Sequence, residues 1–508
     1  MTRPPSIREL LEGGADEAPA IAAPGAPALD YRGLRDQVDG TIDFLNGVGI
    51  GRADRVATVL ANGPEAATCF LAIASSATAA PLNPQYRKDE FAFYLEDLRA
   101  RALVVGPDAP AAAVEAAAGL GVPIVTLTPT LQAGAGRFTL DASGLLKRAA
   151  ASGGPALGGD IALVLHTSGT TSRPKIVPLS GANLAASAGN VAATLKLSSA
   201  DRGLEIMPLF HIHGLVAGVL APLLAGGTVF FPPPFNALGF YSWVREARPT
   251  WWTAVPTMHQ AILARADRNR DVIEGSRPRF LRSSSASLPP TVLAELEATF
   301  SAPVIEAYGM TEAAHQMTSN RLPPGKRKPG TVGVAAGPEV AVMDEAGALL
   351  AAGKTGEVVI RGPNVTAGYE NNPQANAAAF TAGWFRTGDQ GVMDADGYLT
   401  ITGRLKEIIN RGGEKVSPRE VDEALMDHPA VLQAVCFAAP HDKLGEEVCA
   451  AVVLRAGAEA GERELTAFVA ERLAPFKRPR RIVFLDEIPK GPTGKLQRIG
   501  LAQRLGIS

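Results

Sequence analysis

Short runs of apolar residues alternate with amphipathic stretches from about residue 55 to about residue 307. The runs include RVATVLAN, ALVVG, IALVLHTSG and TWWTAV, and helix-like segments such as PEAATCFLAIASSA and TVLAELEATF lie between runs of this kind. This alternation indicates strand–helix–strand units and a largely parallel sheet covered by helices. We therefore predict an α/β core whose ligands bind at the carboxyl ends of its strands.

The pattern changes in the second half of the chain. Between about residues 330 and 402, short alternating strands and frequent turns, as in GEVVIRGP and DGYLTITG, indicate a β-rich subdomain. The run LKEIINRGGEKVSPREVDEALMDHP then begins a further unit of helices and strands. We predict a large α/β domain with a β-rich subdomain over residues 1–403, and a small α+β domain over residues 404–508.

Composition and charge exclude several classes of protein. Hydrophobic residues make up 46% and charged residues 20% of the chain, as in ordinary globular proteins. Because 49 Lys and Arg are balanced by 51 Asp and Glu, a nucleic-acid partner is disfavoured. The three cysteines lack the spacing of a disulfide framework or a zinc site. No secretory signal or membrane-spanning run is apparent, so we expect a cytoplasmic protein without a membrane span.

The most informative segment is IALVLHTSGTTSRPK at residues 161–175, an apolar strand followed by a hydroxyl-rich loop. Backbone N–H groups and hydroxyls in such a loop can bind phosphate oxygens, with a lysine supplying charge. The spacing of a Walker A loop is absent. The segment therefore predicts a different kind of phosphate site, formed by Thr167, Ser168, Gly169, Thr170, Thr171 and Lys175.

This loop resembles the TSGTTGxPKG loop of the acyl-CoA synthetases and related adenylate-forming enzymes, although Ser172 and Ile176 stand at usual glycine positions. Further motifs match that family in order over nearly the whole chain. In YGMTE, at residues 308–312, the resemblance implies that Tyr308 lies against adenine, that Thr311 contacts phosphate and that Glu312 helps to hold Mg²⁺, which prefers oxygen ligands. The remaining nucleotide contacts that it implies are Ser285, Ala286, Ser287, Glu306, Ala307, Asp389 and Arg404.

The same resemblance gives roles to the C-terminal segments. Lys495 in PKGPTGK matches the catalytic lysine that stabilises the charge developing on phosphate during adenylation. Lys406 in GRLK matches the hinge about which the small, mobile domain rotates before thioester formation. Gly412 and Gly413 match the stretch that faces the coenzyme A channel, where a missing side chain permits close approach. ATP, Mg²⁺ and coenzyme A are thus the expected cofactors and co-substrates.

Polar residues stand where this family commonly has glycine or apolar residues around the acid. His211 matches the family's gate position and is grouped here with the catalytic residues, whereas His213, Ser284 and His315 are the candidate acid-binding residues. Ser284 and Ser285 replace glycines, which would shorten the pocket and add hydrogen-bond donors. This combination is most similar to the oxalate–CoA ligases, so the resemblance implies oxalate as the acid.

Three alternatives stay open at this point. The first is the same reaction with malonate or another short acid, and the second is a ligase that loads a carrier protein. The third is a non-enzymatic nucleotide-binding module, which would not need both Glu312 and Lys495. The expected partners are a small carboxylic acid, ATP and coenzyme A, and the protein could be a monomer or a homodimer.

Overall fold

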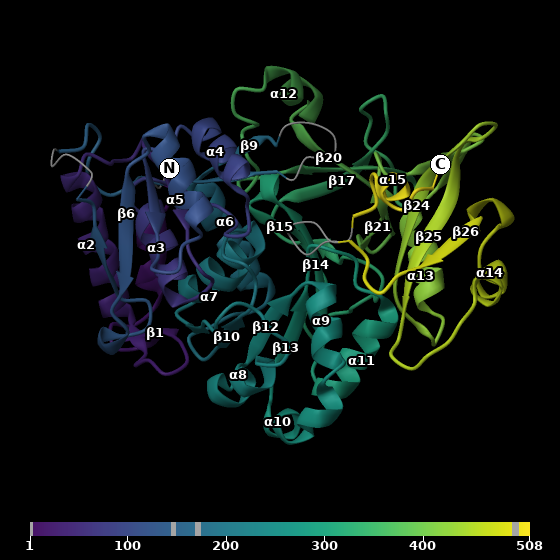
Figure 1. The fold of residues 1–508 in the computed structure, drawn as a ribbon, viewed down its shortest axis with the longest axis horizontal. Helices are drawn as coiled ribbons and strands as arrows, with labels where there is room; N and C mark the ends of the chain where they lie inside the picture. The colour runs from purple at the N-terminus through teal and green to yellow at the C-terminus, as the bar shows by residue number, and fades with distance from the viewer. Residues whose placement is uncertain (1–3, 144–148, 168–173, 490–496, 508) are drawn as a thin grey trace.

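The computed structural model describes residues 4–143, 149–167, 174–489 and 497–507. Within these residues, sheets of seven and nine strands form the N-terminal part, and two five-stranded sheets follow toward the C-terminus (Figure 1). Helices cover the two large sheets. The predicted fold class, a large α/β domain with a β-rich subdomain and a smaller α+β domain, is confirmed.

The seven-stranded sheet is mainly parallel, and its central strands are buried on both faces. Alternate residues of β3 face opposite helix layers: Val56 packs in one hydrophobic cluster with α2 and α3, and Ala57 packs in another with α4 and α5. The sheet contains, in spatial order, β7 (Phe138–Asp141), β6 (Ile124–Pro129), β5 (Ala102–Val105), β3 (Arg55–Val59), β4 (Thr78–Pro81), β8 (Ile161–His166) and β9 (Ile176–Ser180). Its helices are α2 (Tyr31–Gly47), α3 (Pro64–Ala74), α4 (Lys88–Asp97) and α5 (Ala111–Leu120).

The nine-stranded sheet has a parallel centre with antiparallel strands at its edges. In spatial order it contains β16 (Val334–Ala335), β15 (His315–Ser319), β14 (Val304–Met310), β13 (Phe280–Ser283), β12 (Trp251–Ala254), β10 (Arg202–Glu205), β11 (Thr228–Phe230), β1 (Pro19–Ala22) and β2 (Leu29–Asp30). The helices of this region are α1 (Ile7–Leu10), α6 (Gly181–Thr194), α7 (Ala221–Leu224), α8 (Phe240–Ala247), α9 (Pro256–Leu263), α10 (Arg270–Gly275), α11 (Pro290–Phe300) and the π-helix η3 (His213–Leu220).

The third and fourth sheets succeed one another along the chain. The third contains β17 (Glu339–Met343), β18 (Thr355–Arg361), β19 (Phe380–Thr381), β20 (Trp384–Met393) and β21 (Leu399–Arg404), with α12 (Pro373–Ala379) beside it. The fourth contains β22 (Ile409–Arg411), β23 (Glu414–Val416), β24 (Val431–His441), β25 (Gly445–Leu454) and β26 (Arg481–Phe484), with α13 (Pro418–Met426), α14 (Glu462–Ala470) and α15 (Leu501–Arg504). The chain changes sheet between Arg404 and Ile409, while the division into residues 1–403 and 404–508 stays a prediction.

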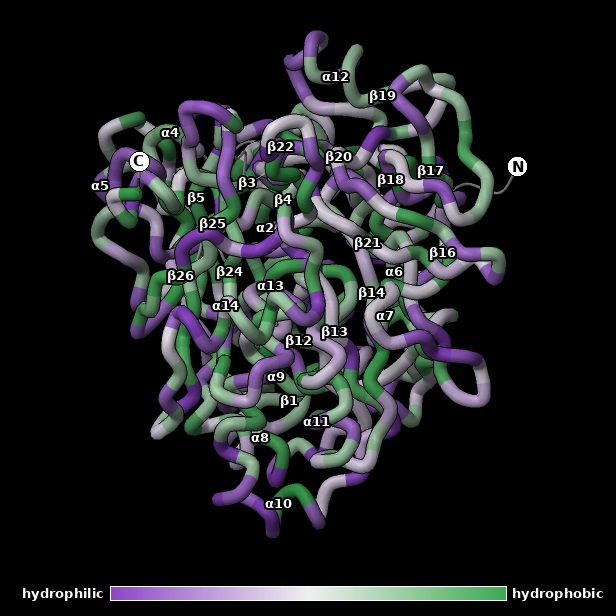
Figure 2. Tube along the Cα trace, turned by 90° about the vertical axis from the view of Figure 1, so that its right-hand side faces the viewer, coloured by the Kyte–Doolittle hydropathy of each residue, from purple (hydrophilic) through white to green (hydrophobic). Residues whose placement is uncertain are grey.

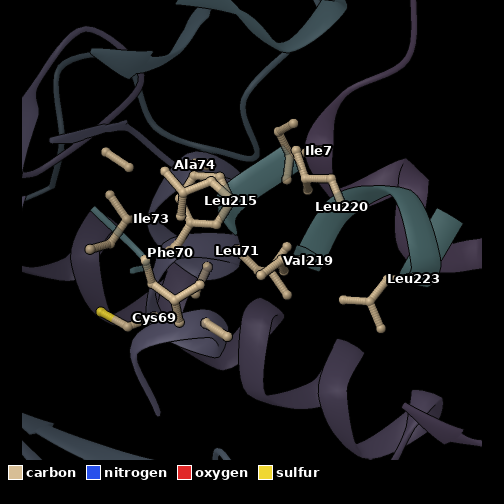
Figure 3. Packing of buried hydrophobic residues seen from close by; sticks show 14 of the residues in the cluster. Ile7, Cys69, Phe70, Leu71, Ile73, Ala74, Leu215, Val219, Leu220 and Leu223 are labelled. Carbon is tan, nitrogen blue, oxygen red and sulfur yellow. The ribbon is translucent and has the colours of Figure 1, made fainter. Parts of the chain in front are cut away.

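The helix η3, which starts at the candidate acid-binding residue His213, is held in place by hydrophobic packing. Every residue of η3 is buried, and Figure 3 shows Leu215 of this helix beside Phe70 of α3, and Leu220 beside Ile7 of α1. The hydrophobic segments run through the interior, and hydrophilic segments lie mostly in the outer loops (Figure 2). Among the described helices, none has both the length and the apolar character needed to cross a membrane.

Candidate active site

Hydrogen bonds connect the two ends of the predicted phosphate loop. Strands β8 and β9 are antiparallel, so the loop connects a hairpin. The backbone N–H of Thr167 donates to the carbonyl of Lys175 at 2.9 Å, and the N–H of Lys175 lies 3.3 Å from the Thr167 hydroxyl. The Lys175 ammonium lies 4.5 Å from the ring centre of Tyr369. Ser168, Gly169, Thr170 and Thr171 lie outside the described residues, so their phosphate contacts stay predictions.

Three of the predicted nucleotide contacts form one hydrogen-bonded group. Asp389 on β20 accepts a hydrogen bond from the Tyr308 hydroxyl, and its other oxygen lies 3.0 Å from Nε of Arg404. Burial and the nearby Asp389 raise the pKa of Tyr308, so its hydroxyl stays protonated as a donor. Antiparallel pairing of β20 with β21 places Asp389 directly opposite Arg404. This group can present a carboxylate and an aromatic ring together, as ribose and adenine require.

Glu312 is a buried carboxylate at the turn between β14 and β15. Its Oε1 accepts a hydrogen bond from the Tyr369 hydroxyl at 2.8 Å, and burial raises its pKa. A divalent cation would favour the ionised form of this carboxylate, as expected for a hard oxygen ligand. Among the described residues, no three metal-ligating side chains are grouped together.

The predicted acid-binding residues meet beside this nucleotide group. His213, the first residue of η3, lies 3.0 Å through Nδ1 from the Ser285 hydroxyl and 2.6 Å through Nε2 from the Thr253 hydroxyl. The rings of His213 and His315 are stacked, with centroids 4.7 Å apart. Both histidines are almost fully buried. Because His315 pairs with Met310 across the β14–β15 hairpin, the candidate acid-binding residues lie next to the predicted nucleotide contacts.

Unusual backbone conformations cluster at the candidate acid-binding residues. Ser285 has φ of 72°, Ala314 has 47° and His315 has 100°, all in the left-handed region that favours glycine. Such conformations cost of order 1–3 kcal/mol and persist where the surroundings impose them, often at functional sites. Ser285 keeps a side chain where the resembled family has glycine, and that side chain bonds His213. Ser284 is fully buried, and its hydroxyl has no hydrogen-bond partner among the described residues.

The sequence did not reveal the role of Arg282, whose guanidinium contacts both histidines. Its Nη1 is 3.2 Å from Nε2 of His213, and its Nη2 is 3.0 Å from Nε2 of His315. The side chain is fully buried, and burial lowers its pKa to about 9. The signal that could have revealed it is an arginine inside the apolar strand FLRS of a parallel sheet, where charges are rarely buried without a purpose.

Glu306 was predicted as a nucleotide contact and is a buried carboxylate in the first half of β14, where it pairs with Ser283 of β13. Burial raises its pKa to about 7, although the guanidinium of Arg419 on α13 acts in the opposite direction. Ala307 beside it is also buried. Ala286 and Ser287 are exposed, and the Ser287 hydroxyl lies 3.5 Å from Glu423 of α13. These residues therefore lie where the nine-stranded sheet faces the C-terminal part of the chain.

Several predicted residues lie away from this group or beyond what the structure describes. His211 precedes η3 with its ring against Phe210, at a centroid distance of 4.6 Å. Lys406 is exposed in the turn between β21 and β22, and Gly412 and Gly413 form the turn between β22 and β23 with positive φ. Lys495 lies outside the described residues. The gate, hinge, coenzyme A and catalytic-lysine assignments stay predictions.

Comparison with known proteins agrees with this geometry. The model of the AMP-binding enzyme family matches residues 13–370, and the model of the AMP-binding enzyme C-terminal domain matches residues 420–495. An oxalate–CoA ligase of Arabidopsis thaliana is 46% identical over 98% of both chains, and a sulfoacetate–CoA ligase of Cupriavidus necator is 39% identical over 89% of this chain and 88% of the relative. The crystal structure of ATP-bound MatB from Rhodopseudomonas palustris superposes with a TM-score of 0.88 over 98% of each chain, at 30% identity. The chain therefore belongs to the AMP-binding enzyme family, whose C-terminal domain it also carries.

Proposed function

We propose that this protein is an AMP-forming acid–CoA ligase and that its acid is oxalate. In the first half-reaction, an oxygen of the acid attacks the α-phosphorus of ATP, giving oxalyl-AMP and pyrophosphate. In the second, the coenzyme A thiolate attacks the activated carbonyl, giving oxalyl-CoA and AMP. The compartment we propose for this reaction is the cytoplasm.

The observation that carries the choice of acid is the buried polar group formed by His213, Ser285 and His315. A long aliphatic or aromatic acid would place apolar atoms against this polar group, at a cost of about 1–3 kcal/mol for each hydrogen bond that is lost. Oxalate has a second carboxylate on the carbon next to the reacting one, and its oxygens can accept those hydrogen bonds. The names of the relatives in Arabidopsis thaliana and Cupriavidus necator, an oxalate and a sulfoacetate ligase, support a small acid with two anionic groups.

The described residues account for substrate positioning in the first half-reaction. Asp389 would accept hydrogen bonds from the ribose hydroxyls, Arg404 would hold that carboxylate in place, and Tyr308 would lie against the adenine. Glu312 would hold Mg²⁺, which supplies charge neutralisation on the phosphates of ATP. Lys495 would add positive charge where negative charge develops in the transition state.

In the second half-reaction, the C-terminal part of the chain would bring coenzyme A to the acyl-AMP. The chain changes sheet just after Arg404, and Lys406 lies exposed in that connection. Rotation about Lys406 would carry the turn at Gly412 and Gly413 to the acyl-AMP, so that coenzyme A can pass close to the backbone. A carrier-protein thiol in place of coenzyme A is the alternative that this step leaves to experiment.

Pyrophosphate release with a panel of acids, measured with and without coenzyme A, tests the proposal. Oxalate should give the highest kcat/KM among oxalate, malonate, acetate, butyrate and cinnamate. Coenzyme A should accelerate turnover, because it removes the bound acyl-AMP. A monocarboxylate that is preferred by about tenfold or more, a difference of about 1.4 kcal/mol, would refute oxalate as the acid.

A further inference from the structure

The side chain of Arg282 is a buried cation that has only neutral hydrogen-bond partners among the described residues. Its Nη1 lies 3.3 Å from the Thr253 hydroxyl and 3.2 Å from His213 Nε2, and its Nη2 lies 3.0 Å from His315 Nε2 and 3.3 Å from Gln316 Oε1. No carboxylate of the described residues forms an ion pair with it. Its Nε also has no hydrogen-bond partner among them.

These contacts fix the hydrogen-bonding roles of the two imidazoles. A guanidinium can only donate hydrogen bonds, and an imidazole nitrogen that carries a proton cannot accept one. Nε2 of His315 faces Arg282 and is therefore an unprotonated acceptor. Nε2 of His213 faces both Arg282 and the Thr253 hydroxyl at 2.6 Å, and it is an acceptor as well when that hydroxyl, which accepts from Arg282, donates its own proton to the ring. The proton of each neutral ring is then on Nδ1, because the hydrogen bond of one ring nitrogen selects the protonation of the other.

Neighbouring groups agree with this assignment. Gln316 is oriented by its own amide nitrogen, which donates to the Ala336 carbonyl at 3.1 Å, so its oxygen faces Arg282. Nδ1–H of His213 then donates to the Ser285 hydroxyl at 3.0 Å, which leaves the proton of that hydroxyl to donate elsewhere. Because Arg282 donates to His213 and His213 donates to Ser285, the Ser285 hydroxyl can use its own proton to donate to the acid.

We propose that Arg282 is a positioning residue that holds His213 and His315 in the neutral Nδ1–H form, and that its uncancelled charge selects acids bearing a second anionic group. This inference rests on the proposed function and names the substrate class of the same site. The positive charge of Arg282 would make binding of a dianion such as oxalate or sulfoacetate more favourable. It would stabilise a bound monoanion of the same length less. Burial of Arg282 strengthens the field of this charge, because little water screens it.

The selectivity test compares oxalate with glycolate, which has a hydroxymethyl group in place of the second carboxylate. In Arg282→Gln, kcat/KM for oxalate should fall by about tenfold to hundredfold, while the value for glycolate changes by less than about threefold and KM for ATP is retained. Arg282→Lys keeps a positive charge and should recover part of the preference. An equal loss for both acids, or a lysine variant no better than glutamine, would overturn the selectivity role.

Arg279→Gln is the matched control, because Arg279 precedes the same strand but forms an ion pair with Asp201 at 2.8 Å. The same chemical change there should leave the oxalate-to-glycolate ratio unchanged. A ratio that fell equally in this control would show that any weakening of the strand alters selectivity, and it would overturn the proposal.

A second measurement needs no substrate. Nitrogen-15 NMR of histidine-labelled wild-type protein, assigned by the signals lost in His213→Gln and His315→Gln, should show both imidazoles neutral with the proton on Nδ1 at neutral pH. In Arg282→Gln at least one ring should change its protonation pattern. Wild-type signals of an Nε2–H or doubly protonated ring would overturn the positioning role. If the wild-type protein activates no oxalate, the proposed function fails, and this measurement still decides what Arg282 does to the histidines.

Discussion

Replacing Glu306 by glutamine should make the protein more stable, and increasingly so as the pH rises. Burial raises the pKa of this carboxyl from about 4.5 to about 7. The folded state therefore binds a proton that the unfolded chain has already lost between these two values. Wild-type stability should fall as the pH rises through this window, because the ionised carboxylate is held in a buried site.

The size of the effect follows from the pKa difference. A shift of about 2 to 3 pH units at about 1.4 kcal/mol each gives a maximum of about 3 kcal/mol, most of which should develop between pH 5 and pH 8. Glutamine resembles the neutral carboxyl in shape and never ionises. The free energy of unfolding of Glu306→Gln minus that of wild type should therefore increase by about 2 to 3 kcal/mol over this range.

Guanidinium denaturation followed by tryptophan fluorescence suits this measurement. Trp251 and Trp252 are buried in β12, in the same nine-stranded sheet as Glu306, so their emission reports unfolding of the relevant part. Glu246→Gln, on an exposed position of α8, controls for the loss of one acidic residue at the surface. A stability difference for Glu306→Gln that stays flat from pH 5 to pH 8, or decreases, would refute the reasoning.

The other predictions concern the two half-reactions. Lys495→Ala should slow acyl-AMP formation by roughly 100-fold or more, the scale of removing one charge stabiliser, while supplied acyl-AMP is still converted to the thioester; equal losses in single-turnover assays of both steps would contradict this. Lys406→Pro fixes φ near −65° and should impair thioester formation more than adenylation, and unchanged rates for both would remove Lys406 from the hinge. Asp389→Asn weakens the acceptor for the ribose hydroxyls and its pairing with Arg404, so KM for ATP should rise by about tenfold to hundredfold, and an unaltered KM in initial-rate kinetics would argue against that contact.

Periodicity and local motifs were sufficient for the architecture. Alternation of apolar runs with amphipathic stretches predicted the parallel sheets, and the helix-like segments PEAATCFLAIASSA and TVLAELEATF correspond to α3 and α11. The turn-rich segment after residue 330 became a separate five-stranded sheet. These features depend on neighbours in the sequence, which is why a single chain is enough to predict them.

The environment of Arg282 depends instead on segments that meet only in the folded state. His213, Thr253 and His315 come from η3, β12 and β15, and no spacing in the sequence relates them to Arg282. Tyr369 is a similar case, since it contacts Glu312 and Lys175 from a segment with no recognisable motif. The left-handed backbone conformation of Ser285 could not be predicted from the sequence either, because a serine residue does not indicate a positive φ.

The most direct test of the central claim is a competition in which oxalate, malonate and acetate are supplied together at equal concentrations with ATP, Mg²⁺ and coenzyme A. Mass spectrometry of the thioesters and chromatography of the nucleotides then identify the products. The account predicts that oxalyl-CoA is the main thioester and that AMP and pyrophosphate form in equal amounts with it. Acetyl-CoA or malonyl-CoA in about tenfold excess over oxalyl-CoA, a difference of about 1.4 kcal/mol in the competing barriers, or ADP and phosphate in place of AMP and pyrophosphate, would contradict it.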